Sequence, residues 1–457
     1  MGFRLHGMDA MPDSHARLVT LVMEQQATIA ALEARLAEQQ ATITRLEQRI
    51  RDLAGGIVPP SRMPGHKPAA ASVTGDRPPR AKRLRNLARR RASATVQVSH
   101  ALAICPHCGV PLAGGSIKRR REVLDLAPQP VVVTEHVFLE RCCGGCQRRV
   151  TPAVALDGLA VGRSRLGVGL LSLIALLREE LRLPLAAIQR YLDRVHGCRL
   201  SVGGIVGALE QVARAGAAEH ARILAAIQAS PVVHADETGW REDGVNGFIW
   251  TFSTPTACYY THGGRSNAML DATLTGAVGT LVTDFYAAYD HYPGVQQKCW
   301  SHLWRAIREL DRQHPDDAGL AAWCNAVAAI YRDATRFSHP DERTRMAQRR
   351  ALTVRLQATC QPFLTDERAP QARVCRRIEK YLDRLFTFVV DPTVPPTNNA
   401  AERSLRHLVV SRKISGGTRS AQGTQTKLTL ASLFTTWRLR GLDPFLACRQ
   451  MLTSPQV

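Results

Sequence analysis

The sequence predicts a multidomain chain of the α+β class. Three observations support this prediction: a heptad repeat near the N-terminus, two Cys-x-x-Cys pairs in the first third of the chain, and a change after residue 230 from helical periodicity to short β-branched runs. The 457 residues suffice for two or three domains, and the 45% of hydrophobic residues suffice for a sizeable core.

A regular heptad runs through the first fifty residues. Its seam advances in steps of three and four residues, which is typical of a coiled coil. The seam positions are Leu18, Val22, Gln25, Ile29, Leu32, Leu36, Gln39, Ile43, Leu46, Ile50 and Leu53. Gly55-Gly56 and Pro59-Pro60 end the helix. We expect this helix to self-associate; the alternative is a helix packed on its own domain.

A basic stretch follows the heptad. The net charge is +21, and residues 60–150 contain 17 Lys and Arg against 5 Asp and Glu. Such a surplus favours a polyanionic partner, because basic side chains neutralise phosphates and release counterions; a membrane surface is the rival partner. The candidate phosphate-binding residues are Lys82, Arg83, Arg85, Arg89, Arg90 and Arg91. The alternative is a solvated flexible tail.

Two cysteine pairs predict a structural zinc site. The candidate ligands are Cys105, Cys108, Cys143 and Cys146, and each Cys-x-x-Cys can hold two thiolates close enough for one tetrahedral ion. The intervening Val131–Val133 and Val137–Leu139 are expected to form strands of a hairpin, so the segment resembles a zinc ribbon. His107 and Cys142 are spare candidates, and reduced structural thiols are the alternative.

The remaining cysteines are scattered, which suits a reducing compartment. The N-terminus lacks the apolar region of a signal peptide. The longest uncharged apolar run, Leu166–Leu177, is too short to span a bilayer. These observations predict a cytoplasmic, nucleoid-associated protein without a membrane partner.

Residues 165–215 are predicted to be helical. Leu166–Leu181 forms one helix, Pro184 stands in the first turn of the next, and Gly197 ends it. Ser201 can cap a third helix. Two helices joined by a short turn containing glycine can be a helix-turn-helix; a plain helical bundle is the alternative.

After residue 230 the pattern changes to short strands. Val232 and Val233 begin a strand that ends on Asp236. Further strands are expected at Asn246–Phe252, Ala257–Thr261, Thr280–Asp284 and Gln297–His302. Three antiparallel strands followed by alternating helices and parallel strands is the order of a ribonuclease-H-like mixed sheet. Residues 311–390 are helical by pattern and are expected to be an insertion.

Three carboxylates are candidates for one metal site. Asp236 and Asp284 each end a predicted strand, where α/β sheets place ligands, and Glu402 lies in a helix opened by Pro395-Pro396-Thr397-Asn398-Asn399. Hard oxygen ligands suit magnesium or manganese rather than zinc, and two such ions can drive phosphoryl transfer. The alternatives are a plain turn for Asp236 and a capping box between Asn399 and Glu402.

Several motifs agree with one family in type and order. They are His234-Ala-Asp236-Glu237-Thr238, Asp284-Phe-Tyr286-Ala-Ala-Tyr289, Cys299-Trp-Ser-His302 and Asn398-Asn-Ala-Ala-Glu402-Arg403-Ser-Leu-Arg406. Together with the heptad, the basic linker and the cysteine pairs, they resemble the insertion-sequence 66 family of bacterial transposases. Trp304 departs from the pattern, because a basic residue is expected there.

The resemblance implies a ribonuclease-H-like core with an Asp-Asp-Glu triad, which by motif match is Asp236, Asp284 and Glu402. Such enzymes hydrolyse the phosphodiester at the 3′ ends of the element and join those ends to target DNA. Arg403 and Arg406 would lie beside the triad and bind phosphate. Glu237, Cys299 and His302 are candidates for lining the site; for the last two a buried structural pair is the alternative.

We therefore expect a metal-dependent DNA transposase with catalytic magnesium or manganese and structural zinc. Its partners would be double-stranded DNA, further copies of the chain and possible accessory proteins encoded by the element. A non-enzymatic, zinc-containing dimeric DNA-binding regulator is the main alternative, and an inactive remnant is another. The expected segments are a coiled-coil helix (1–54), a basic linker (55–100), a zinc-ribbon-like domain (101–160), a helical DNA-binding domain (161–229), a catalytic core (230–445) with a helical insertion (311–390), and a C-terminal tail (446–457).

Overall fold

The computed structural model describes isolated positions between Met23 and Thr44 and residues 96–121, 129–153, 156–162, 164–277 and 279–454. The chain divides into two compact units, Met1–Leu124 and Asp125–Val457. The described positions between Met23 and Thr44 are helical, in agreement with the heptad, and self-association of this helix stays a prediction. The basic linker residues, numbered 82 to 91, lie outside the described residues.

Four consecutive helices begin the folded part of the second unit. They are α2 (Val168–Glu179), α3 (Leu185–His196), α4 (Val202–Ala215) and α5 (Ala217–Gln228). Local signals determine their ends: Gly197 adopts a φ of 63° after α3, and the Ser201 hydroxyl accepts the Gly204 N–H to cap α4. The helices predicted for this segment are therefore confirmed, whereas a DNA-reading role for α3 and α4 stays a prediction.

A five-stranded sheet follows, with the order β5-β4-β3-β6-β7. Its strands are β3 (Val232–Glu242), β4 (Val245–Ser253), β5 (Cys258–Gly263), β6 (Thr280–Thr283) and β7 (Gln296–Lys298). Strand β4 pairs antiparallel with β3 and β5, whereas β6 runs parallel to β3 and β7. The predicted strands and their directions are therefore confirmed in outline, and the fold is mixed α and β. Two predicted ends are wrong: β3 continues six residues past Asp236, because β4 pairs with it as far as Glu242, and Trp300–His302 begin helix α7 (Trp300–Gln313) instead of ending a strand. The Asp243-Gly244 turn between β3 and β4 has positive φ at both residues, which suits a two-residue hairpin.

Alternation along β3 gives the two faces of the sheet different cores. Val233 and Ala235 pack with residues of α2–α5. Val232 packs with the helices that follow β7, and Trp240 packs with Leu405 and Leu428 from two later helices. Since successive strand residues point to opposite faces, the even-numbered side chains of β3 all face the helices that follow β7 in the chain.

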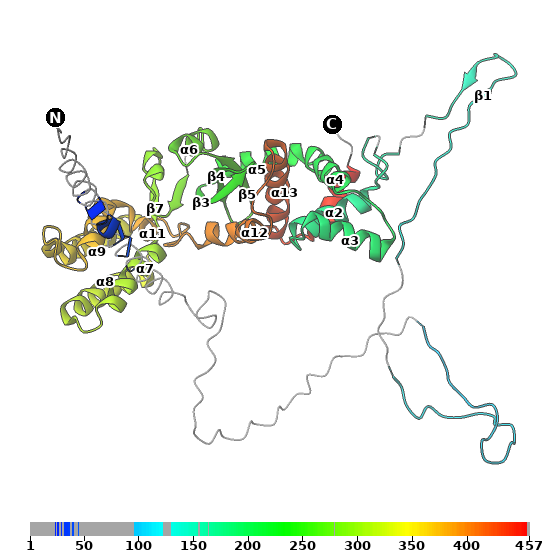
Figure 1. Cartoon of the computed structure of the whole chain (residues 1–457), viewed down its shortest axis with the longest axis horizontal. Coiled ribbons are helices and arrows are strands. Elements are labelled where there is room, and N and C mark those ends of the chain that lie inside the picture. The colour runs from blue at the N-terminus through cyan, green and yellow to red at the C-terminus, as the bar shows by residue number, and fades with distance from the viewer. Residues whose placement is uncertain are drawn as a thin grey trace, which may run out of the picture. The chain divides into compact units, whose positions relative to one another are not determined.

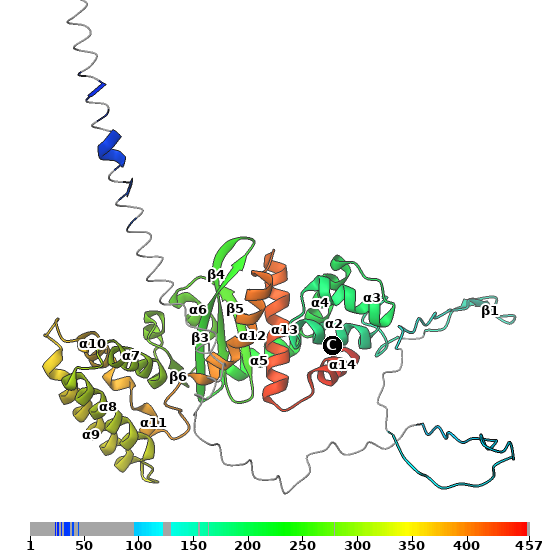
Figure 2. The same ribbon diagram turned by 60° about the horizontal axis from the view of Figure 1, so that its bottom comes forward.

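Helices α12 (Asn399–Ser415) and α13 (Ala421–Leu439) lie side by side on the sheet (Figure 2). Helix α12 contacts β3 and β4, and α13 covers the outer strand β5. The hydroxyls of Ser432 and Thr436 accept the N–H groups of Tyr260 and Cys258. Helix α13 thus satisfies the hydrogen-bonding groups of an otherwise open sheet edge.

The insertion predicted for residues 311–390 is helical. Helix α6 (Asn267–Thr273) precedes β6, and α7 (Trp300–Gln313) follows β7. The later helices are α8 (Ala318–Arg336), α9 (Glu342–Cys360), α10 (Ala372–Lys380) and α11 (Thr387–Val390), with 3₁₀ turns at Ala287–His291, Gln361–Phe363 and Leu382–Arg384. Together with α7 they bury a separate apolar cluster, and α11 contacts β7 (Figure 1).

The segment predicted as a C-terminal tail, 446–457, lies mostly in helix α14 (Pro444–Thr453), so that prediction is corrected. The Asp443 carboxylate caps the helix by accepting the Leu446 N–H, and Pro444 occupies its first turn. Cys448 and Leu452 are buried in the core that α2 shares. Ala447 and Met451 pack beside them, so an apolar stripe at helical spacing was present in the sequence.

The prediction that residues 131–133 and 137–139 form the strands of a zinc-ribbon hairpin is wrong. Val131–Val133 and Val137–Leu139 are exposed and lie outside any strand; the antiparallel pair is β1 (Arg141–Cys142) with β2 (Arg149–Val150). A β-branched run becomes a strand only where a partner supplies hydrogen bonds and an apolar face to cover.

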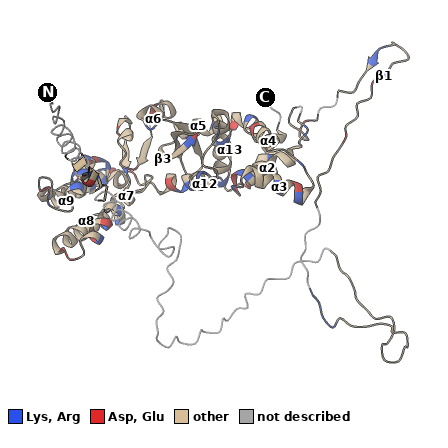
Figure 3. Cartoon of the chain, viewed as in Figure 1, with Lys and Arg blue, Asp and Glu red and all other residues tan. Residues whose placement is uncertain are grey.

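Within the described part of the chain, no helix combines the length and the hydropathy needed to cross a membrane. Basic residues of the second unit occur on α3 as well as around α7 and α9 (Figure 3). Positive charge is therefore spread over several helices of this unit.

Candidate active site

Asp236 lies on β3, on the face of the sheet that α12 covers. The neighbours on that face, His234 and Thr238, contact Asn398 and Arg412 at the two ends of α12. Asp236 is half-buried, and its Oδ1 accepts the backbone N–H of Glu237 at 2.9 Å. Its carboxylate therefore lies between the sheet and the helix that carries Glu402.

Asp284 directly follows β6, the parallel neighbour of β3. Paired residues of the two strands, such as His234 and Val282, differ by 48 in number, and the same offset separates Asp236 from Asp284. Neighbouring strands are about 4.8 Å apart, so the two carboxylates leave the sheet side by side. The Oδ1 of Asp284 accepts the Tyr286 N–H, which fixes the turn after β6.

Glu402 lies in the first turn of α12 and turns toward α7. Its Oε1 accepts a hydrogen bond from Arg305 at 2.5 Å and lies 3.7 Å from Nδ1 of His302. The helix N-cap is Asn398, and no side-chain capping bond forms there. Glu402 therefore does not act in a capping box, and the basic residue beside it is Arg305, one position after Trp304.

The charges of the other carboxylates act on Asp236, although the ligand oxygens of Asp236, Asp284 and Glu402 do not all lie within 4.8 Å of one another. Burial, then the charges of Asp284 and Glu237, and more weakly that of Glu402, raise the pKa of Asp236 to about 7, opposed by the hydrogen bond from Glu237. Carboxylates that repel one another are stabilised by a bound cation. The donor set, oxygen only from Asp236, Asp284 and Glu402, fits magnesium or manganese.

Asn398 connects the cluster to the sheet. It is fully buried, and its side chain donates to the Ala235 carbonyl at 2.7 Å and lies 3.0 Å from Nδ1 of His234. Its backbone N–H donates to Sγ of Cys299 at 3.1 Å. The start of α12, and with it Glu402, is thereby held against β3 and the start of α7.

Cys299 and His302 lie beside Glu402, and their role in lining an active site stays a prediction. Their ligand atoms and the Glu402 carboxylate all lie within 4.8 Å of one another. Burial and the charge of Arg305 lower the pKa of His302, which favours the neutral ring. Nδ1 of His302 is buried and accepts or donates no hydrogen bond among the described residues.

Glu237 lies on the opposite face of β3 from Asp236. Its Oε2 accepts the Tyr289 hydroxyl at 2.6 Å, and its Oε1 accepts from Arg265 at 2.8 Å. The Arg265 guanidinium also lies 4.1 Å from the centre of the Tyr286 ring. Successive residues of a strand point to opposite faces, so Glu237, predicted to line the site, does not point to the same side as Asp236. It acts on Asp236 through its charge.

Lys298 is a buried cation beside the site that the sequence analysis missed. Its ammonium donates to Thr283 Oγ1 at 3.1 Å and lies 3.4 Å from Asp290. Burial lowers its pKa to about 8, opposed by Asp290. Asp290 also accepts the Tyr381 hydroxyl at 2.9 Å, so this network joins β7 to α10. The sequence signal that could have revealed Lys298 is a lysine inside a short strand that is expected to be buried.

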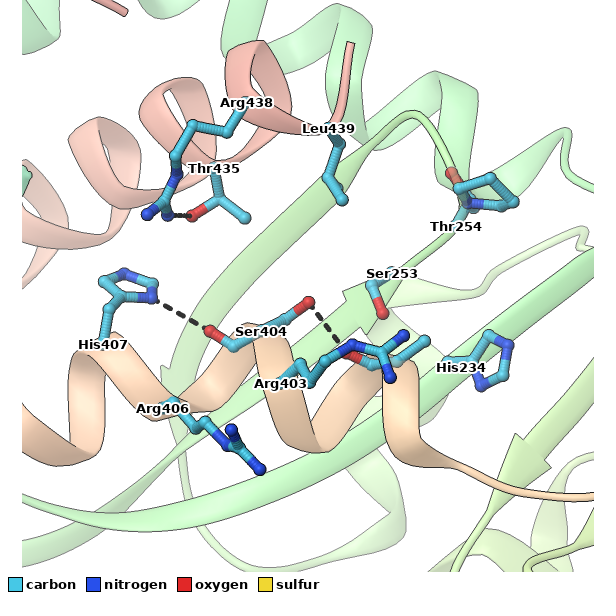
Figure 4. Close-up of a pocket in the computed structure, with 12 residues that line it drawn as sticks. His234, Ser253, Thr254, Arg403, Ser404, Arg406, His407, Thr435, Arg438 and Leu439 are labelled. Carbon is cyan, nitrogen blue, oxygen red and sulfur yellow. Dashed lines mark hydrogen bonds between the residues drawn. The ribbon is translucent and has the colours of Figure 1, made fainter. Parts of the chain in front are cut away.

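Arg403 and Arg406, predicted to bind phosphate, line a pocket of about 550 Å³ together with Arg438 of α13 (Figure 4). Arg403 is rotated about 100° from Glu402 around the helix, so it faces this pocket rather than α7. Two buried polar atoms of the lining, Ser253 Oγ and His407 Nε2, have no partner among the described residues. Three arginines thus line the pocket together with apolar residues such as Pro255 and Leu439.

Each cysteine pair brackets a tight turn of the same form. The N–H of Gly109 donates to the Cys105 carbonyl at 3.0 Å, and that of Gln147 donates to the Cys143 carbonyl at 2.9 Å. Backbone N–H groups, chiefly of His107 and Cys146 respectively, lower the pKa of Cys105 and of Cys143. Cys142 lies in β1 instead, with its sulfur near the Gln147 carbonyl.

Comparison with known proteins gives a family match. The model of the family described as "Transposase IS66 family" matches residues 163–426. The chain is 25% identical over 366 residues to the uncharacterized protein y4hP of Sinorhizobium fredii, covering 71% of this chain and 65% of that relative. It is also 25% identical over 220 residues to the uncharacterized protein y4qI of the same organism, covering 44% and 40%. The chain thus spans less than two thirds of the length of these relatives.

Proposed function

Since the chain belongs to the IS66 family of transposases, we propose that it cuts and joins DNA with Asp236, Asp284 and Glu402 as its acidic triad. One observation carries the proposal: these carboxylates come from β3, the end of β6 and α12, and the charges of the latter two raise the pKa of the first. Acidic residues just beyond the last parallel pair of β3 and β6, His234 with Val282, are suited to divalent cations.

The strand order supports a ribonuclease-H-like core. In β5-β4-β3-β6-β7 the first three strands are antiparallel and the last two run parallel to β3. Both aspartates then belong to the two central neighbours, β3 and β6, and the glutamate enters from a helix packed on the same face.

In the proposed reaction, two divalent cations would activate the attacking water or 3′-hydroxyl and stabilise the leaving oxygen of the phosphodiester. Asp236, Asp284 and Glu402 would hold these cations in their ionised forms. Asn398 would hold the start of α12, and with it Glu402, at a fixed position relative to β3. Arg305, already beside Glu402, would bind a DNA phosphate. Hydrolysis at the 3′ ends of the element and joining to target DNA would use the same carboxylates.

The other segments have supporting roles in the proposal. The matched turns around Cys105 and Cys143 favour one structural zinc bound by Cys105, Cys108, Cys143 and Cys146, with Cys142 left out. The N-terminal helix would multimerise the chain, and the linker would bind DNA phosphates. Arg403 and Arg406 would bind phosphate at the opening of their pocket. Accessory proteins of the element remain possible partners.

The deciding experiment is cleavage of labelled element-end DNA by the wild-type chain and by Glu402→Ala, with magnesium and with EDTA. We expect cleavage only by the wild-type chain with magnesium. Glu309→Ala is the matched control, because Glu309 is an exposed glutamate on α7 that pairs only with its own helix. Tight binding without cleavage in every condition, even with the other element-encoded proteins added, would favour the non-enzymatic regulator.

The zinc assignment has its own test. Cys105→Ser should lose zinc and weaken DNA binding, because metal-binding energy is folding energy for such a small module. Cys142→Ser should keep its zinc. Measurement of zinc per chain by mass spectrometry separates the two, and unchanged zinc in Cys105→Ser would contradict the assignment.

A further inference from the structure

Cys299, His302 and Glu402 converge from two helices. Cys299 precedes α7, His302 lies in its first turn, and Glu402 faces them from α12. A sulfur, a ring nitrogen and a carboxylate oxygen lie within 4.8 Å of one another. The three side chains therefore form a compact group with mixed donor atoms.

Two polar contacts prepare this group for a cation. Nδ1 of His302 is buried, has no hydrogen-bond partner among the described residues and lies 3.7 Å from Glu402 Oε1. Sγ of Cys299 accepts the N–H of Asn398 at 3.1 Å, so the sulfur lies in a polar contact between the two helices, and a bound cation would displace the thiol proton. An unpaired imidazole nitrogen and an N–H-supported sulfur are the environment of metal ligands rather than of a plain apolar core.

The donor set selects the metal. Sulfur and imidazole prefer zinc, whereas magnesium prefers oxygen alone. Zinc bonds of about 2.0–2.3 Å in a tetrahedron place ligand atoms about 3.5 Å apart, so small side-chain rotations would close the present group around an ion. Water would take the fourth position.

We propose that Cys299, His302 and Glu402 form a zinc site and that zinc bound there inhibits DNA cleavage. Glu402 cannot serve both this site and the oxygen cluster with Asp236 and Asp284. Occupancy would draw the carboxylate toward α7, where Arg305 already holds one of its oxygens. Zinc binding is argued from the three side chains alone. Inhibition of DNA cleavage by that zinc rests on the proposed function.

Binding is tested first, on the full chain. After equilibration with zinc and removal of the free metal, the wild-type chain should hold one zinc ion more than Cys299→Ser or His302→Gln, both of which keep the cysteine turns. Cobalt substitution should give the same difference as a loss of thiolate-to-cobalt absorption in Cys299→Ser. Cys324→Ser, a half-buried cysteine on α8, is the control. Equal zinc in wild-type and both variants, with unchanged circular dichroism, would overturn the site.

Inhibition is tested second. With magnesium fixed, micromolar zinc should lower wild-type cleavage at least tenfold, and Cys299→Ser should lose less than twofold relative to its own zinc-free rate. Equal inhibition of both proteins would overturn the regulatory half. If the wild-type chain cleaves no DNA at all, the proposed function fails while the zinc measurement still decides the site.

Discussion

The side-chain oxygen of Asn398 lies 3.0 Å from Nδ1 of His234, and by this contact helix α12 is held against strand β3. The same side chain donates to the Ala235 carbonyl at 2.7 Å. Both partners are one or two residues from Asp236, and Asn398 begins the turn that carries Glu402. These two contacts thus fix the position of Glu402 relative to Asp236.

Replacing Asn398 should damage both stability and activity. Asn398→Ala would leave the buried Ala235 carbonyl and His234 without partners, which costs about 1–3 kcal/mol of unfolding free energy. Cleavage should fall further than stability, because Glu402 loses its position relative to Asp236. Urea denaturation and a cleavage assay measure the two effects. Val410→Ala, at an exposed position of α12, should change neither, and equal behaviour of both variants would contradict the anchoring role.

Asp236→Asn should make the metal-free protein more stable while abolishing cleavage. At pH 8 Asp236 is ionised in both states, but in the folded state burial and the neighbouring carboxylates raise its pKa to about 7, so its charge is less favourable there than in the solvated unfolded chain. Each pKa unit corresponds to about 1.4 kcal/mol. Thermal unfolding with EDTA should therefore occur at a higher temperature in the variant, and magnesium should stabilise only the wild-type chain. Asp271→Asn, which removes an exposed charge from α6, should have no effect on either measurement.

The free energy of unfolding should depend on Lys427 and Glu179 together, because each neutralises the buried charge of the other. The two side chains are 2.7 Å apart and join α13 to α2. Lys427→Met leaves the Glu179 carboxylate buried without its partner, which costs about 3–5 kcal/mol of unfolding free energy. The double variant with Glu179→Leu should recover most of this loss in urea denaturation. By contrast, Arg355→Met breaks an exposed pair with Asp333 and should cost less than about 1 kcal/mol.

His407 should contribute to acid unfolding. Burial, with the charges of Lys427 and Arg438, lowers its pKa to about 3, whereas the unfolded value is 6.5. Between these values the unfolded chain binds the additional proton, so stability falls by about 1.4 kcal/mol per pH unit as the pH drops below 6.5. His407→Leu should show a flatter decline in denaturation midpoints between pH 6.5 and 4. The exposed His314→Leu should follow the wild-type curve; a flattened curve there as well would contradict the assignment to His407.

Much of the fold follows from local signals that the sequence carries. Gly197 ends α3 and Ser201 caps α4, because a positive φ and an N-cap hydroxyl are requirements of the chain itself. The β-branched runs gave the strands of the sheet, since each had a neighbouring strand to pair with. The same signal was wrong at Val131–Val133, where the described chain offers no partner strand.

The sequence by itself identified the family and proposed the three carboxylates, because the motifs that carry them are contiguous. Only the tertiary structure decided which groups surround them. Glu237 follows Asp236 in sequence but lies on the other face of β3, since strand neighbours point in opposite directions. Asn398, Arg305 and Lys298 contact the site through residues far away in the chain. Contacts of that kind depend on packing between elements, which no local pattern of residues encodes.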